Sequence, residues 1–143
     1  KGEVDATFLA YAGLHRLKLT ESITEIIPAE VMLPAVAQGA IAIVARADDT
    51  NILELTEQLN HSKTAVCVES ERSFLGTLDG SCRTPIAGLA ILEDDKLWLR
   101  GQIISTDGSK IWKTERRGNM SDNVKLGKDA AEELRKSAGT DFF

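Results

Sequence analysis

The stretch LDGSCRTPIAG, residues 78–88, has the clearest potential for chemistry. Cys82 stands between a glycine-containing turn and the predicted start of a strand, so its thiol is expected on an exposed loop. The adjacent Arg83 favours the thiolate and so makes the cysteine a better nucleophile, whereas Asp79 acts in the opposite direction. Loop cysteines often have no chemical role, so these residues leave two hypotheses open, a functional nucleophile and a bystander.

The other potential metal and disulfide residues are scattered. Cys67 precedes Cys82 by 15 residues, no CxxC pair is present, and His15 and His61 lie far from both cysteines in sequence. A zinc site is therefore not expected. Cys67 is predicted to be a core residue on the apolar face of a helix, and with no secretory signal visible both cysteines are expected to be reduced.

Two further polar residues could contact a ligand. Gln38, beside Gly39 in LPAVAQGAIA (33–42), could approach a ligand with its amide and the neighbouring backbone, or could simply form a tight interdomain turn. Arg16 either complements the C-terminus of the opening helix or clamps a ligand carboxylate with two hydrogen bonds. Phosphate-binding loops, dinucleotide fingerprints and serine-hydrolase motifs do not occur in the sequence.

The elements that must position these residues follow from the apolar periodicity. Spacings of three and four predict a helix over residues 4–17, and the apolar run of residues 40–46 predicts a strand buried on both faces. Asn51 and Glu54, at capping-box spacing, predict a following helix. Its inward-facing residues are expected to be Ile52, Leu55 and Leu59. A lone strand cannot satisfy its hydrogen bonds, so its partners are expected from sequence outside these 143 residues or from another chain.

From residue 62 onward the pattern predicts a self-sufficient α-β-β-β-α unit. A helix is expected from Ser62, its possible N-cap, to Leu78. Period-two segments over 86–92, 97–103 and 110–116 predict an antiparallel meander, with turns at Asp94-Asp95 and Asp107-Gly108. Trp98 and Trp112 are expected to pack against each other across neighbouring strands. A last helix, capped by Ser121, is expected to bury Val124, Gly127, Ala131, Leu134 and Ala138.

Composition narrows the class of protein. The chain is 43% hydrophobic and 27% charged, with a net charge of −5 and a pI near 5.1, which is typical of a globular protein and argues against nucleic-acid binding. The short basic pair Arg116-Arg117 is expected at the end of a hairpin strand. The longest apolar stretch, residues 31–45, contains Pro34, Gln38 and Gly39 and is too short to span a membrane.

Three motifs together resemble one family. LDGSCRTPIAG (78–88) closely resembles the cofactor-loop signature of porphobilinogen deaminase, also called hydroxymethylbilane synthase. LPAVAQGAIAI (33–43) resembles the interdomain segment of that family, and ATFLAYAGLHRL (6–17) resembles one of its helices. The motifs occur in the family's order, and the α-β-β-β-α tail matches its third domain.

The resemblance implies an enzyme of tetrapyrrole biosynthesis. Such an enzyme joins four porphobilinogen molecules head to tail with loss of ammonia and frees hydroxymethylbilane by hydrolysis. The family's loop cysteine holds a dipyrromethane cofactor through a thioether, a role that carries to Cys82. Arg16 matches an arginine that pairs with pyrrole carboxylates, and Ala10, Val36 and Gln38 match positions lining the cofactor and substrate cleft. Arg72 is expected to support the cysteine loop.

The resemblance also implies a domain organisation. The fold expected is part of a periplasmic-binding-protein-like α/β domain pair followed by a small α+β domain. Residues 1–38 would end domain 2, residues 39–60 would return to domain 1, and residues 61–143 would form the cofactor-anchoring domain 3.

The N-terminal half of such an enzyme, which holds the catalytic aspartate acting as general acid, is expected to be the missing partner, so these residues alone should be inactive. A monomer is expected, in a bacterial cytoplasm or, as the alternative, a plastid stroma. The competing class is a non-catalytic module that binds a small anion.

Overall fold

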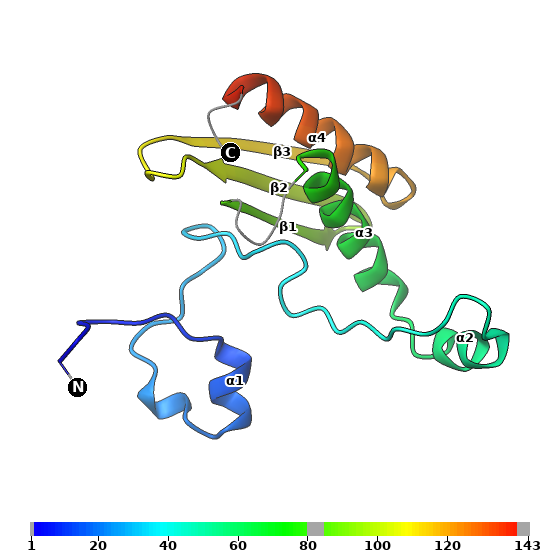
Figure 1. Ribbon diagram of the computed structural model, residues 1–143, viewed down its shortest axis with the longest axis horizontal. Coiled ribbons are helices and arrows are strands. Elements are labelled where there is room, and N and C mark those ends of the chain that lie inside the picture. The colour runs from blue at the N-terminus through cyan, green and yellow to red at the C-terminus, as the bar shows by residue number, and fades with distance from the viewer. Residues whose placement is uncertain (1, 80–84, 140–143) are drawn as a thin grey trace. The chain divides into compact units, whose positions relative to one another are not determined.

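The computed structural model describes residues 2–79 and 85–139, which include every helix and strand of Figure 1. The chain divides into two compact units, Lys1–Met32 and Leu33–Phe143. No helix among the described residues is long and apolar enough to cross a membrane.

The first unit contains little regular structure. Helix α1 spans only Tyr11–Arg16, and a 3-10 turn, η1, follows at Thr20–Ser22. The helix predicted over residues 4–17 is therefore wrong in its first half. The N-cap residue of α1, Ala10, has no side-chain hydrogen bond, and the helix buries none of its residues, so nothing stabilises further turns.

The second unit is built on a three-stranded antiparallel sheet. Strands β1 (Ile86–Glu93), β2 (Lys96–Ile104) and β3 (Ile111–Asn119) lie in the order β1-β2-β3, as the meander predicted. The turn between β1 and β2 is at Asp94-Asp95, as expected. Both aspartates have positive φ, a conformation that Asp tolerates better than most residues.

Two helices cover one face of this sheet (Figure 1). Helix α3 spans Ser62–Thr77 and helix α4 spans Asn123–Ala138, which confirms the predicted α-β-β-β-α order. Both predicted caps are wrong by one position. The His61 side chain accepts the hydrogen bond that starts α3, and Asp122 precedes α4 after a 3-10 turn, η2 (Met120–Asp122).

The core lies between the helices and the sheet. Its buried hydrophobic residues are Phe74, Leu78, Ala90, Leu97, Leu99, Ile103, Ala130, Ala131, Leu134 and Ala138. Four of the five residues predicted to be buried on the last helix are buried, but Val124 is exposed.

The two tryptophans lie on opposite faces of the sheet, which corrects the predicted cross-strand pair. Trp112 is paired with Ile103 and packs against the core, whereas Trp98 is paired with Arg117 on the other face. The guanidinium carbons of Arg100 and Arg117 lie 4.4 and 4.0 Å from the centre of the Trp98 ring. Cation–π contacts thus replace the expected aromatic pair.

Residues 40–59, in the first part of the second unit, differ most from expectation. Residues 40–46 form no strand, and Ile41 is 94% and Val44 92% exposed. Helix α2 spans Thr50–Glu57, and its cap is Asp49, whose side chain accepts the Ile52 N–H. The three residues expected to face inward, Ile52, Leu55 and Leu59, are exposed. No described strand pairs with residues 40–46.

Candidate functional site

The segment of residues 33–40 lies against the open edge of β1. Among the described strands β1 pairs only with β2, so its other edge presents backbone N–H groups. The Gly88 N–H donates to the Pro34 carbonyl oxygen at 3.0 Å. Val36 packs against the core at Gly88, where an added Cβ would stand 3.2 Å from Val36 Cγ2. One hydrogen bond and one apolar contact therefore dock the start of the segment.

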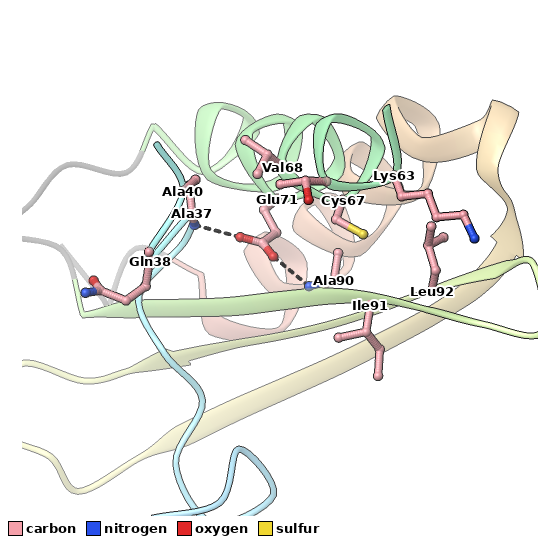
Figure 2. Close-up of a pocket in the computed structure, with 12 residues that line it drawn as sticks. Ala37, Gln38, Ala40, Lys63, Cys67, Val68, Glu71, Ala90, Ile91 and Leu92 are labelled. Carbon is pink, nitrogen blue, oxygen red and sulfur yellow. Dashed lines mark hydrogen bonds between the residues drawn. The ribbon is translucent and has the colours of Figure 1, made fainter. Parts of the chain in front are cut away.

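A buried carboxylate completes this docking (Figure 2). Glu71 Oε2 accepts the Ala37 N–H at 2.6 Å, and Glu71 Oε1 accepts the Ala90 N–H at 2.7 Å. The residue is only 5% exposed. Burial raises the pKa of Glu71 above its ordinary value, although the two backbone hydrogen bonds act in the opposite direction.

The residues after Pro34 form a tight turn that carries Gln38. The Gln38 N–H donates to Ala35 O and the Ala40 N–H donates to Ala37 O, while Ala37 and Gly39 have φ values of 57° and 84°. The turn predicted from Gln38 and Gly39 is confirmed. The Gln38 side chain is exposed and points away from Glu71 in Figure 2.

A cavity of about 460 Å³ opens beside this turn. The residues that line it include Gln38, Lys63, Cys67, Glu71 and the β1 residue Leu92. Cys67 is half-buried against the core, close to its predicted place. Burial, and secondarily the charge of Glu71, raises the pKa of the Cys67 thiol, so this thiol is a poor nucleophile.

The predicted anchor, Cys82, and its neighbour Arg83 lie outside the described residues. The described residues at the two ends of their connection contact the rest of the unit. On one side Leu78 is fully buried and Asp79 lies 3.6 Å from the Arg135 guanidinium. On the other, the Ile104 N–H donates to the Pro85 carbonyl oxygen at 2.9 Å.

The remaining predicted site residues belong to different parts of the chain. Val36 and Gln38 are brought together with Glu71 in the second unit. Ala10 and Arg16 lie at the two ends of α1 in the first unit, and both are exposed. Arg72, expected to support the cysteine loop, is an exposed residue of α3. Among the residues that the structure describes, no group of three or more His, Cys, Asp or Glu could hold a metal ion.

Glu71 is the buried acid of this candidate site, and the motifs of the sequence did not single it out. Its signal was present, because Cys67, Glu71, Phe74 and Leu78 recur at spacings of four, three and four on one stripe of α3. A carboxylate on an otherwise apolar stripe indicates a buried acid with specific partners.

Comparison with known families accounts for both units. The family model described as "Porphobilinogen deaminase, C-terminal domain" matches residues 65–136, which include the three strands and most of α3 and α4. The chain belongs to the porphobilinogen deaminase family. The model described as "Porphobilinogen deaminase, dipyromethane cofactor binding domain" matches residues 1–54. Two models of this family therefore match the chain, one in its first part and one in its last.

Individual relatives agree with this assignment. The chain is 50% identical over 142 residues to a porphobilinogen deaminase of Nitrobacter hamburgensis, and 49% identical to that of Nitrobacter winogradskyi. It is 49% identical over 146 residues to the chloroplastic porphobilinogen deaminase of Pisum sativum. These alignments cover 99–100% of this chain but only 40–45% of the relatives, so the chain spans less than half of their length.

Proposed function

We propose that this chain is the cofactor-carrying portion of a hydroxymethylbilane synthase. The complete enzyme would condense four porphobilinogen molecules with loss of ammonia and release hydroxymethylbilane by hydrolysis, in tetrapyrrole biosynthesis. The observation that carries this proposal is the motif LDGSCRTPIAG, placed between α3 and β1 within a chain that belongs to the family.

Cys82 is the proposed anchor of a dipyrromethane cofactor, held through a thioether on its Sγ. When bound, the cofactor supplies the acceptor on which the pyrrole chain is built. The described ends of the connection that carries the thiol support this role, because Leu78 is buried in the core and the Pro85 carbonyl oxygen accepts the Ile104 N–H. Arg16 has an exposed guanidinium that can hold a pyrrole acetate or propionate with two hydrogen bonds.

The proposed domain organisation follows the family. Residues 1–38 end domain 2, residues 39–60 return to domain 1, and residues 61–143 form domain 3, with domains 1 and 2 resembling periplasmic binding proteins. The exposure of Ile41 and Val44 supports this organisation, since a run of this composition is typical of a strand covered on both faces. The covering strands would come from the N-terminal half of the enzyme.

That N-terminal half would also supply the general acid that protonates the leaving amine, so the 143 residues alone should make no product. Ala10, Val36 and Gln38 would line the cleft shared by cofactor and substrate. The relatives are bacterial and chloroplastic, which supports a bacterial cytoplasm or a plastid stroma as the location. We propose a monomer.

A chimeric enzyme tests the proposal. This chain replaces the matching part of the Nitrobacter hamburgensis deaminase, to which it is 50% identical. The expected results are hydroxymethylbilane formation from porphobilinogen and, in the denatured protein, extra mass equal to two pyrrole units. Cys82→Ser should remove both.

Cys67→Ala is the matched control, because Cys67 lies against the core and should not affect attachment. Full turnover of Cys82→Ser, or attachment lost in Cys67→Ala but kept in Cys82→Ser, would show that the anchor is wrong. A chimera with neither adduct nor product would favour a non-catalytic module that binds small anions.

A further inference from the structure

We propose that Glu71 is a positioning residue that holds residues 33–40, and with them Gln38, against the open edge of β1. The inference rests on the proposed function, in which Gln38 lines the cleft shared by cofactor and substrate. Both described partners of Glu71 are backbone N–H groups, so it acts through the backbone it holds.

The first argument concerns the acceptors of the backbone N–H groups at the open edge of β1. Alternate residues of β1 point their N–H groups to the open edge, and Gly88 and Ala90 are two of them. Gly88 donates to backbone at Pro34, whereas Ala90 donates to the Glu71 side chain. A side chain that accepts the second bond allows the docked segment to leave the strand edge at Ala37 and turn. Without that acceptor the buried Ala90 N–H would be left without its partner.

The second argument is the conformation of Ala37. Its φ of 57° is in the left-handed region, which an alanine rarely adopts and which persists only where the surroundings enforce it. The Glu71 carboxylate binds the N–H of this residue at 2.6 Å. Gln38 is the next residue, so the same hydrogen bond determines where its amide is presented.

The third argument is that both carboxylate oxygens of Glu71 are used to hold backbone N–H groups. Glu71 is 5% exposed on the apolar stripe of α3, where a carboxylate needs hydrogen-bond donors to replace water. Each of its two oxygens accepts one backbone N–H from a different segment, Ala37 and Ala90. A glutamine of the same shape can accept only one of these bonds, because its nitrogen has no acceptor capacity. The carboxylate is thus required for both contacts at once.

Amide hydrogen exchange in the full-length chimera tests the contact directly. In Glu71→Gln we expect exchange at Ala37 or Ala90 to become at least about tenfold faster, because one charge-assisted hydrogen bond is lost. Exchange in the centre of β2, at Leu99, should not change. Glu69→Gln is the matched control, since Glu69 lies on the same helix and accepts from the Asn123 amide instead.

Kinetics test the consequence. In Glu71→Gln we expect the KM for porphobilinogen to rise about tenfold, with a smaller change in kcat and with the cofactor mass still present. Glu71→Asp, which keeps the charge but is one methylene shorter, should show the same pattern. Unchanged exchange and KM in both variants would overturn the inference. So would uniformly faster exchange throughout the domain, or failure of both variants to fold, because either would assign Glu71 to stability alone.

The inference and the proposed function fail in different ways. A chimera without a pyrrole adduct on Cys82 would refute the proposed function, while exchange at Ala37 and Ala90 would still report whether Glu71 holds the segment. A loaded, active chimera with unaltered exchange in Glu71→Gln would refute the inference alone.

Discussion

Two apolar runs of this chain have nearly the same character but different structures. Residues 86–92, IAGLAIL, form β1, which pairs with β2 and contributes Ala90 to the core. Residues 40–46, AIAIVAR, form no strand, and Ile41 is almost fully exposed. The difference lies in their partners, because β2 follows β1 after a two-residue turn, whereas no described strand pairs with residues 40–46. Apolar character predicts a strand only where a ladder is available to complete it.

The largest expected effect on stability separates the core, to which β1 contributes, from the exposed run of residues 40–46. Phe74→Ala should lower the free energy of unfolding by about 3–5 kcal/mol, because the ring is fully buried between α3 and the sheet. Ile41→Ala in the same chain should change it by less than about 0.5 kcal/mol, since the side chain is exposed. Urea unfolding followed by circular dichroism measures both values.

The full-length chimera sharpens the same comparison. If the N-terminal half covers residues 40–46 as proposed, Ile41→Ala should there cost about 2–5 kcal/mol, the usual cost of truncating a buried isoleucine. An equally small effect in the chain and in the chimera would contradict the proposed return to domain 1.

A pair of glycines tests how closely the helices of the described core approach each other. A Cβ added at Gly127 of α4 would overlap the Ser70 carbonyl oxygen of α3, so Gly127→Ala should destabilise the protein by about 1–3 kcal/mol. Gly76 lies in α3 with nothing within 4 Å of an added Cβ, so Gly76→Ala should stabilise it by about 0.5–1 kcal/mol. Thermal unfolding of the two variants distinguishes them by the sign of the change. Equal effects would mean that α3 and α4 are not in close contact.

The smallest expected effect is a pH dependence in the turn between β2 and β3. Hydrogen bonds from the Ser105 hydroxyl and from the Ser109 N–H and hydroxyl lower the pKa of Asp107 to about 2. A carboxyl whose pKa falls on folding stabilises the fold above its unfolded pKa, near 4, and this contribution is lost as the pH falls from there towards 2.

Asp107→Asn should therefore reduce stability at pH 7, and the gap from the parent should narrow between pH 4 and pH 2. Because the carboxylate is exposed, the gap should be small and should shrink further in high salt. Unfolding midpoints measured across this range check the prediction, and a gap independent of pH would contradict it.

The parts of the fold that were predictable are those with local causes. The order α-β-β-β-α and the turn at Asp94-Asp95 depend on residues close together in sequence, and both are confirmed. The helix over residues 4–17 and the inward face of α2 were wrong, because both predictions required a surface on which the apolar stripe could pack. Amphipathic spacing describes what a helix would bury, and burial itself depends on a partner.

In the candidate site, too, the residues with local causes were predictable and the long-range contacts were not. The turn at Gln38 was predictable from its glycine, and Cys67 from its apolar helix stripe. Glu71 was not singled out, since its place on the apolar stripe indicates burial but does not say which groups the carboxylate binds. Its assignment required the positions of Ala37 and Ala90.

The sequence by itself determined the family, the order of elements in the second unit and the chemistry of its turns, because motifs and short-range spacing carry that information. Only the tertiary structure decided that Trp98 and Trp112 lie on opposite faces of the sheet. It also decided that residues 40–46 lie open and that Glu71 joins backbone groups 34 and 19 residues away. Strand register, burial and long-range hydrogen bonds depend on which segments meet in space, and neighbours in sequence do not specify that meeting.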